Sequence, residues 1–259
     1  MRMMKKVLGT VTVLALSVSL LAGCGSTAAS PVSSAASTAA ESTTSSVVSE
    51  TTSAAADENV AAAAQLLNDL TGSYQELWPV ILADEYQQTW LDDCTALVGE
   101  ENAEAAFEKL SSMVTGDVYG EDAVEAYANG GGAYFCGFTN SLATLTFDGE
   151  TSTISGTDKD GNVLFSHTYH YIGMEPVHGL YEFESDDADS GEFTYFFLAP
   201  DTSAETYHIE FRYGSDAEAL SQYDAGDYAY WVASGISTDC DQTMIDNCIE
   251  LFCTENLAG

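Results

Sequence analysis

Positive charge is scarce in this chain. Its 259 residues include 6 Lys and Arg against 41 Asp and Glu, and no carboxylate precedes Cys24. The basic residues beyond Cys24 are Lys109, Lys159 and Arg212. The chain after that cysteine therefore carries a net charge of about −38. Such a surface repels phosphate backbones and anionic lipid headgroups, which excludes nucleic-acid binding and polybasic membrane attachment.

Catalytic signatures are also missing. None of GxSxG, HExxH, GxGxxG and the P-loop occurs in a fitting context, and there is no CxxC pair to bind zinc through thiolates. A hydrophobic content of 46% is nevertheless enough for one sizeable core. We expect a folded binding protein without enzymatic activity.

Residues 1–23 are typical of a lipoprotein signal peptide. Three basic residues within Met1–Lys6 precede an apolar run, Val7–Leu16, that is short for a membrane span. The run leads to Leu21-Ala22-Gly23-Cys24, which resembles the lipobox of bacterial lipoproteins, where cleavage precedes a diacylglycerol-bearing cysteine. We expect Cys24 to be the lipidation site that anchors an extracytoplasmic protein to the bacterial cell membrane. The alternative is an ordinary secretory signal with a chance cysteine.

A low-complexity segment follows, over residues 24–56. After Cys24 almost every residue is Ser, Thr or Ala, and apolar residues show no period of 3.6 or 2. Burial of so few apolar groups cannot offset the entropy of ordering the chain, so we expect a flexible linker. Residues 57–259 are expected to form one folded domain.

The first half of that domain has a helical pattern. Apolar residues recur at helical spacing in the segments 60–67, 80–97, 103–114 and 121–128. Asp57 is placed to cap the first segment, and Gly130-Gly131-Gly132 ends the pattern. Two more helices are expected near the C-terminus, at 216–222 and 238–252, the second capped by Thr238 or Asp239.

The second half has the pattern of a β structure. Candidate strands are 133–138, 142–147, 152–155, 163–172, 180–184, 193–199 and 207–213. Turn residues such as Asp148-Gly149 and Ser190-Gly191 separate several of them. Sequential strands with short turns predict an antiparallel meander that closes into a barrel or curls into a sandwich, within a single α+β domain.

Two segments in this half carry a family resemblance. Residues 195–200 (YFFLAP) and 207–216 (YHIEFRYGSD) resemble the ZinT family of extracytoplasmic zinc-binding proteins. Residues 67–79, 142–149 and 236–251 match its opening strand, central hairpin and closing helix in order. The resemblance spans most of 67–253. It implies an antiparallel lipocalin-like (calycin) β-barrel with helices in the N-terminal part and a C-terminal helix.

The same resemblance implies a ligand set for Zn²⁺. The family binds zinc with three histidines, one at a strand end and two in a His-x-His pair on the next strand. These positions fall on Ala199, His208 and Glu210, so one ligand is kept, one becomes a carboxylate and one is absent. A His-rich stretch near the mature N-terminus is missing as well. Because the domain also occurs fused to zinc-uptake lipoproteins, the resemblance implies a zinc-uptake transporter as a partner.

Reasoning from the residues supports two of these donors. Side chains two apart on a strand share a face, so His208, Glu210 and Arg212 are expected on one face and Ile209, Phe211 and Tyr213 on the other. An imidazole and a carboxylate suit Zn²⁺, but a third donor is needed. If the turn around 186–191 joins strands 180–184 and 193–199, residues near His178 lie beside those near Ala199, which makes His178 the candidate. Other candidates are His167, His170, Asp201 and Glu205.

Simpler roles stay open for these groups. His208 paired with Glu210 also fits a polar contact at a barrel mouth, and His167 and His170 fit strand residues that bind neighbouring side chains. The acidic run 186–192 has oxygens spaced for Ca²⁺ but lacks EF-hand spacing, so an acidic hairpin tip is the alternative.

Five cysteines follow Cys24, and export permits disulfides between them. An odd number leaves at least one unpaired. The candidate pairs are Cys94 with Cys136, and Cys240 with Cys248 or Cys253.

Two other functions remain open. A barrel that has lost its metal could bind a small apolar ligand or a protein partner, as the aromatic residues Phe193, Tyr195 and Phe197 suggest. A hydrolase with an unrecognised site is the third possibility.

Overall fold

The computed structural model describes residues 47–199 and 208–258, with side chains from residue 58 onward. Contacts divide the chain into two units, 1–61 and 62–259. Residues 1–23, expected to be a signal peptide, and the expected lipidation site Cys24 lie outside the described residues. The end of the expected linker lies within helix α1 (Val47–Asp69), which therefore begins earlier than the residue 60 that apolar spacing predicts. Within the described residues no helix has the length and apolar character that a membrane crossing requires.

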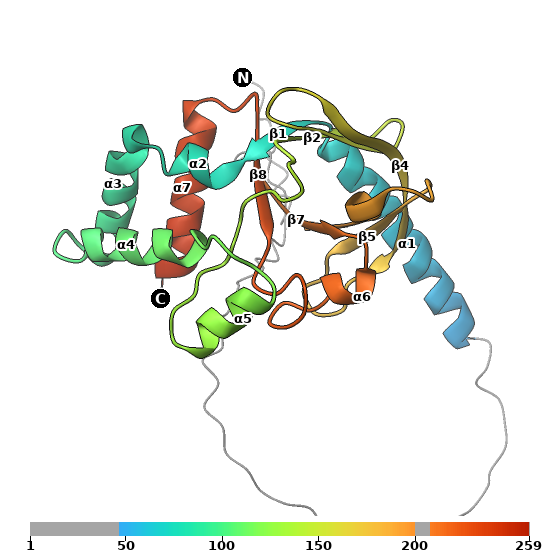
Figure 1. The fold of residues 1–259 in the computed structure, drawn as a ribbon, viewed down its shortest axis with the longest axis horizontal. Coiled ribbons are helices and arrows are strands. Elements are labelled where there is room, and N and C mark those ends of the chain that lie inside the picture. The colour runs from blue at the N-terminus through green and yellow to red at the C-terminus, as the bar shows by residue number, and fades with distance from the viewer. Residues whose placement is uncertain (1–46, 200–207, 259) are drawn as a thin grey trace, which may run out of the picture. The chain divides into compact units, whose positions relative to one another are not determined.

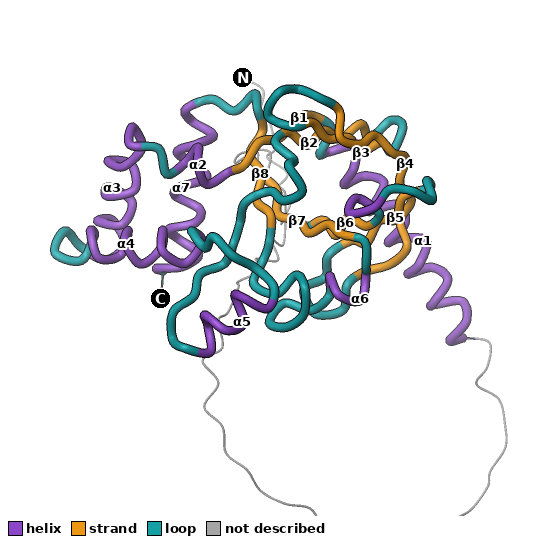
Figure 2. Tube along the Cα trace, viewed as in Figure 1, coloured by secondary structure: helices purple, strands orange, loops and turns teal. Residues whose placement is uncertain are grey.

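Eight antiparallel strands form a closed barrel in which each strand pairs with its neighbours in the sequence (Figures 1 and 2). Strand β8 closes the barrel by pairing with β1, with Tyr74 opposite Ser237. The strands are β1 (Gly72–Glu76), β2 (Thr144–Asp148), β3 (Thr153–Thr157), β4 (Val163–Met174), β5 (Tyr181–Ser185), β6 (Tyr195–Leu198), β7 (His208–Gly214) and β8 (Ala233–Ser237). The predicted α+β class and calycin-like barrel are confirmed.

Aromatic side chains fill the inside of the barrel. Alternate residues of each strand point inward, and Phe165, Phe196 and Tyr213 are almost completely buried there. Phe193 stacks on Phe165 with ring centroids 4.0 Å apart, and Phe196 lies 5.4 Å from Tyr213. The end of α1 adds Leu66 and its neighbours to the same core. Rings of this size leave the barrel packed in the way small barrels usually are.

A second core lies outside the barrel. Helices α2 (Leu77–Ile81), α3 (Gln87–Val98), α4 (Ala103–Val114) and α7 (Gln242–Leu257) gather beside strands β1 and β8 (Figure 1). Trp78, Trp90 and Phe252 meet between them, with Phe252 in edge contact 4.8 Å from Trp78 and 6.0 Å from Trp90. Two further helices are α5 (Glu121–Ala128) and α6 (Ala217–Leu220).

Three sequence-based expectations about elements are wrong. Residues 133–138 do not form a strand, because their backbone groups make isolated contacts with separate segments: Tyr134 N–H donates to Met113 O at the end of α4, and Phe135 N–H donates to Tyr230 O in the loop before β8. The expected helix 80–97 is broken into α2, a single 3₁₀ turn and α3. Residues 238–241 precede the closing helix, because Asp241 is its N-cap and accepts a hydrogen bond from Met244 N–H at 3.0 Å.

The cysteine pairs expected from the sequence do not form. All five described cysteines are free, and Cys94 contacts Cys253 across the α3–α7 interface, not Cys136. Cys136 lies in the irregular segment after α5, where burial raises the pKa of its thiol.

Candidate metal site

Strand β7 places its polar residues on the outer face of the barrel. Ile209, Phe211 and Tyr213 belong to the barrel core, so His208 and Glu210 share the opposite face, as predicted. Burial of three large apolar side chains fixes this facing, because a slip of one residue would bring the polar set inside. Pairing with β8 sets His208 opposite Ile236 and Glu210 opposite Ser234.

A small hollow lies between this face and the outer helices. It has a volume of about 30 Å³ and is lined from β7 by His208 and Glu210, and from α7 by Cys248 and Glu255. The rest of its wall is apolar: Leu77, Trp78, Ile81, Leu251 and Phe252. A water molecule or a single metal ion needs about this much space.

The chemistry of the wall suits a borderline metal ion. Imidazole nitrogen, carboxylate oxygen and thiol sulfur are the donors that Zn²⁺ accepts, whereas Ca²⁺ takes six to eight oxygens. Burial, followed by the charge of Glu210, raises the pKa of the Cys248 thiol to about 12. A metal that used this sulfur would have to displace its proton.

The donors do not converge in the structure. Among residues 47–199 and 208–258, no group of three or more His, Cys, Asp or Glu side chains is arranged so that it could hold a metal ion. His208 and Glu210 are half-buried and Glu255, one turn from the end of α7, is exposed. A ligand set at the hollow therefore requires side-chain movement, and Glu255 has the exposure that permits it.

His178 is not among the residues that line the hollow at His208 and Glu210. It ends the turn between β4 and β5, with its ring centroid 3.8 Å from that of Tyr223. Its Nδ1 is 3.4 Å from Oε2 of Glu175, a fully buried carboxylate that also accepts hydrogen bonds from the backbone N–H groups of Val177 and His178. The hollow at β7 is lined by other residues.

The position of the family's absent histidine borders Glu210. Ala199 follows β6 and donates its N–H to the Glu210 carbonyl at 3.0 Å, so the expected neighbourhood is present although the methyl group cannot bind metal. Asp201 and Glu205 lie outside the described residues. His167 and His170 bind neighbouring carboxylates, with Nδ1–Oδ distances of 2.7 Å to Asp187 and Asp186.

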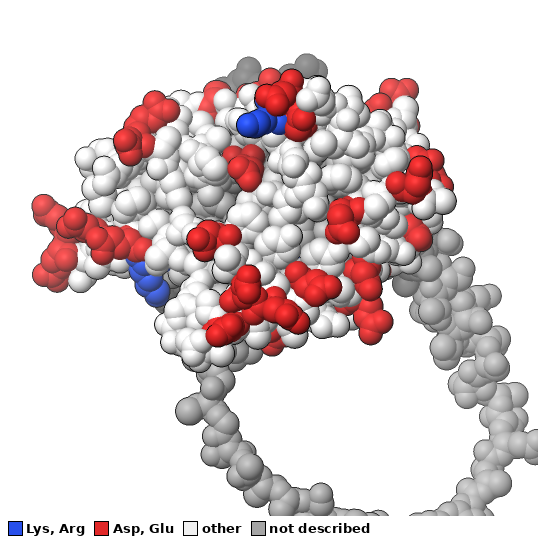
Figure 3. Space-filling model, viewed as in Figure 1, with Lys and Arg blue, Asp and Glu red and all other residues white. Residues whose placement is uncertain are grey.

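The surface favours cations of any kind. Red carboxylates cover many parts of the visible face, with few blue cationic side chains between them (Figure 3). This imbalance raises the local concentration of divalent ions without choosing among them. Selectivity for one metal must come from the donor set.

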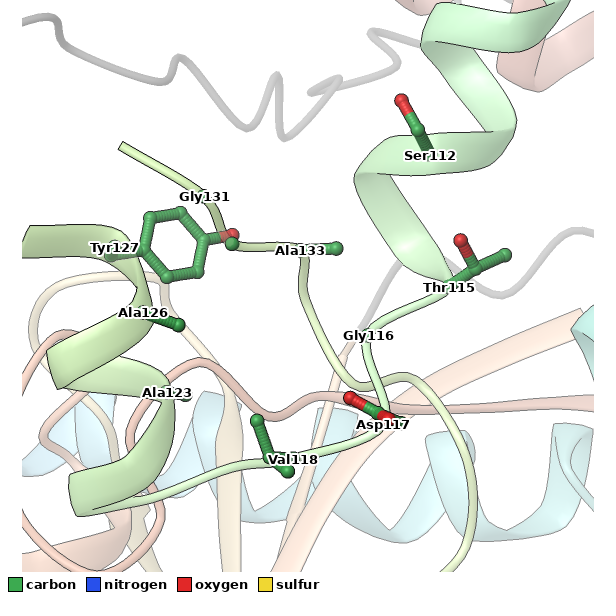
Figure 4. Close-up of a pocket in the computed structure, with 11 residues that line it drawn as sticks. Ser112, Thr115, Gly116, Asp117, Val118, Ala123, Ala126, Tyr127, Gly131 and Ala133 are labelled. Carbon is green, nitrogen blue, oxygen red and sulfur yellow. The ribbon is translucent and has the colours of Figure 1, made fainter. Parts of the chain in front are cut away.

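A larger hollow, of about 400 Å³, lies between the end of α4, helix α5 and the glycine-rich loop after it. Tyr127 stands beside Gly131 and Ala133 at one side, with the side chains of Ser112 and Thr115 across the space and Asp117 below (Figure 4). The Tyr127 ring stacks on Tyr230 with centroids 3.7 Å apart. An aromatic wall with hydroxyl groups and one carboxylate suits a small neutral or cationic organic molecule.

Comparison with known proteins gives structural neighbours only. No protein-family model matches the chain, and no curated protein matches it. Among solved structures, the Zn(II)-bound ZinT-like domain of AdcA from Streptococcus pneumoniae is 15% identical, with a TM-score of 0.44 over 70% of this chain and 87% of that domain. Zn(II)-bound AdcA from the same organism is 13% identical, with a TM-score of 0.41 over 71% of this chain. The chain spans 34% of that AdcA structure. The first of these structures is a ZinT-like domain, and ZinT is the family that the sequence resembles.

Proposed function

We propose that this protein is an extracytoplasmic divalent-metal binding protein with Zn²⁺ as its cargo, and not an enzyme. The observation that carries the proposal is the hollow at which His208 and Glu210 of β7 face Cys248 and Glu255 of α7. The imidazole and carboxylate sit where the family resemblance puts two of three zinc ligands. The acidic surface supports cation capture.

Glu255 is the third donor in this proposal. It lines the hollow together with His208 and Glu210, whereas His178 packs on Tyr223. Its exposed side chain can turn into the hollow at an entropy cost of about 2 kcal/mol, which coordination of Zn²⁺ readily offsets. Water or the Cys248 sulfur then completes the four positions that zinc prefers.

Calorimetric titration with Zn²⁺ tests the site, using the chain from residue 25 onward so that no lipid is present. We expect one ion per chain. His208→Ala, Glu210→Gln and Glu255→Gln should each weaken binding by roughly 100-fold or more, since loss of a group that only hydrogen-bonds to a metal ligand already costs about 10–100-fold. Competition by Ca²⁺ should be weak, because the hollow offers too few oxygens.

Two further variants separate the rival assignments. Glu250→Gln removes another exposed carboxylate from α7 away from the hollow, and it should leave binding unchanged. His178→Ala should also have no effect. If His178→Ala weakens Zn²⁺ binding and Glu255→Gln does not, the third donor is His178, the histidine that the sequence predicted, and not Glu255. If the Zn²⁺ affinity of the His208 and Glu210 variants equals that of the parent, the proposed zinc function is wrong.

Anchoring and delivery extend the same proposal. Lipidation at Cys24 would hold the domain on the outer face of the membrane, within reach of a zinc-uptake transporter. Labelling cells with a radioactive fatty acid, followed by isolation of the protein and its Cys24→Ser variant, tests the anchor. Label in the parent chain and none in the variant is the expected result.

A second candidate function is binding of a small organic ligand. Aromatic rings fill the barrel interior, so a ligand there would meet packed side chains. The hollow beside Tyr127, at about 400 Å³, has the size of a ligand pocket. A fragment screen by ligand-observed NMR would support this function if fragments bound the parent and were lost from Gly131→Phe, which fills the hollow.

A further inference from the structure

Two buried thiols meet between α3 and α7. Cys94 and Cys253 are fully buried, and their Sγ atoms lie 4.0 Å apart although 159 positions separate them in the chain. The reduced thiols are in van der Waals contact at this distance, and an S–S bond of about 2.05 Å needs an approach of roughly 2 Å.

The interface around the pair brings like charges together. Asp93 precedes Cys94, and the negative charges of Glu250 and Asp246 of α7 act on its carboxyl group. Burial and these neighbouring charges raise the pKa of Asp93, and its Oδ2 is buried without a hydrogen-bond partner among the described residues. The charges that shift the pKa of Asp93 are all negative, and none comes from a Lys or Arg side chain. Repulsion at this point opposes the packing of α3 on α7, and a covalent bond would oppose the separation of the two helices.

We propose that Cys94 and Cys253 form a disulfide in the exported protein, and that this bond joins α3 to the last turns of α7. The compartment expected from the signal peptide is one where disulfides form and persist. The oxidant is a disulfide of a thiol–disulfide oxidoreductase or of a small thiol. The bond and its effect on stability do not depend on zinc binding.

The exchange balances in two steps. The thiolate of one cysteine attacks a sulfur of the oxidant, forms a mixed disulfide and releases one oxidant thiolate. The second cysteine thiolate then attacks the mixed disulfide, which forms the Cys94–Cys253 bond and releases the other oxidant thiolate. The two thiol protons and two electrons end on the oxidant. Burial raises the pKa of both thiols, so the exchange takes place while α7 is still undocked during folding.

Peptide mapping under non-reducing conditions tests the bond. The chain from residue 25 onward is refolded with glutathione and glutathione disulfide, alkylated in denaturant and digested. We expect a linked pair of peptides that contain Cys94 and Cys253, while Cys136, Cys240 and Cys248 are alkylated. Alkylation of both Cys94 and Cys253 would overturn the proposal. A disulfide that joins either of them to another cysteine would overturn it as well.

Thermal unfolding gives an independent measure. A native disulfide that closes a long loop should raise the Tm of the oxidised protein above that of the reduced protein by roughly 5–15 °C. Cys94→Ser and Cys253→Ser should abolish this difference, and Cys136→Ser, which removes another buried thiol, should keep it. If the serine variants do not fold, the peptide map of the parent chain still decides. Equal Tm values for the oxidised and reduced parent would count against the bond.

Discussion

The guanidinium carbon of Arg212 lies 4.2 Å from the ring centroid of Tyr223, in the interior of a protein that has almost no other cations. Arg212 is fully buried, and it donates hydrogen bonds to the backbone carbonyls of Leu220, Gln222 and Tyr228. One side chain of β7 thus binds the end of α6 and two carbonyls of the segment that leads from α6 toward β8. Desolvation lowers the pKa of this group, but an arginine stays charged at any physiological pH.

Replacing Arg212 should therefore unfold or strongly destabilise the domain. Arg212→Met leaves three carbonyls without their donor, and Arg212→Lys replaces a planar fork with a single ammonium group that cannot serve all three. We expect each variant to lose about 3–5 kcal/mol in the free energy of unfolding, measured by urea denaturation. Lys109→Gln removes an exposed cation from α4 and should stay within about 0.5 kcal/mol of the parent. Near-parental stability of Arg212→Lys would show that the carbonyl contacts contribute little.

Packing at one turn of the barrel depends on the absence of a side chain. A Cβ atom added at Gly149, between β2 and β3, would lie 2.4 Å from Asn68 Cα and 2.6 Å from the Leu67 carbonyl oxygen. The Gly149 N–H also donates to Thr71 Oγ1 at 3.0 Å. These contacts fasten the turn to the end of α1, and backbone atoms cannot move aside as a flexible side chain could.

Gly149→Ala should lower the free energy of unfolding by about 1–3 kcal/mol, because the turn or the helix end must shift. Gly131→Ala is the matched control, since a Cβ there meets no atom within 4 Å. Chemical denaturation of the two variants, side by side with the parent, provides the measurement. Equal stability of both variants would mean that the turn yields easily.

The sequence predicts the regular elements better than it predicts the barrel closure. Helices α4 and α5 begin and end where apolar spacing and Gly130-Gly131-Gly132 place them, because local periodicity and a helix stop decide both ends. Strand β8 was missed. Its Ala-Ser-Gly-Ile-Ser run has one β-branched apolar residue, and it is a strand because β7 and β1 pair with it on either side.

The candidate site also combines residues that local sequence predicts with one that only tertiary packing brings in. Alternation along β7 places His208 and Glu210 on one face without any tertiary information. Glu255 could not be identified, because 45 positions separate it from Glu210 and only the docking of α7 brings it to the hollow. In a sequence with 41 carboxylates, no local signal distinguishes the one that lines a hollow together with an imidazole.

Protonation of Asp93 at low pH should stabilise the packing of α3 on α7. Burial first, then the charges of Glu250, Asp246 and Asp92, raises the pKa of Asp93 above its ordinary value. The folded state therefore binds this proton more tightly than the unfolded state does. Ionisation of Asp93 opposes folding at neutral pH, and this penalty disappears as the pH falls through the raised pKa.

Asp93→Asn removes that penalty and supplies an amide that can donate to the facing carboxylates. Because Asp93 is only partly buried, we expect a modest gain at pH 7, about 1–3 °C in Tm. The gain should shrink as the pH falls from 7 toward the raised pKa, since protonation of Asp93 removes the same penalty from the parent and general charge repulsion weakens equally in both proteins. Asp92→Asn, on the exposed side of α3, is the control and should give a smaller gain with less dependence on pH. Thermal unfolding of the three proteins between pH 5 and pH 7 measures the effect, and a Tm difference for Asp93→Asn that grows on acidification would contradict it.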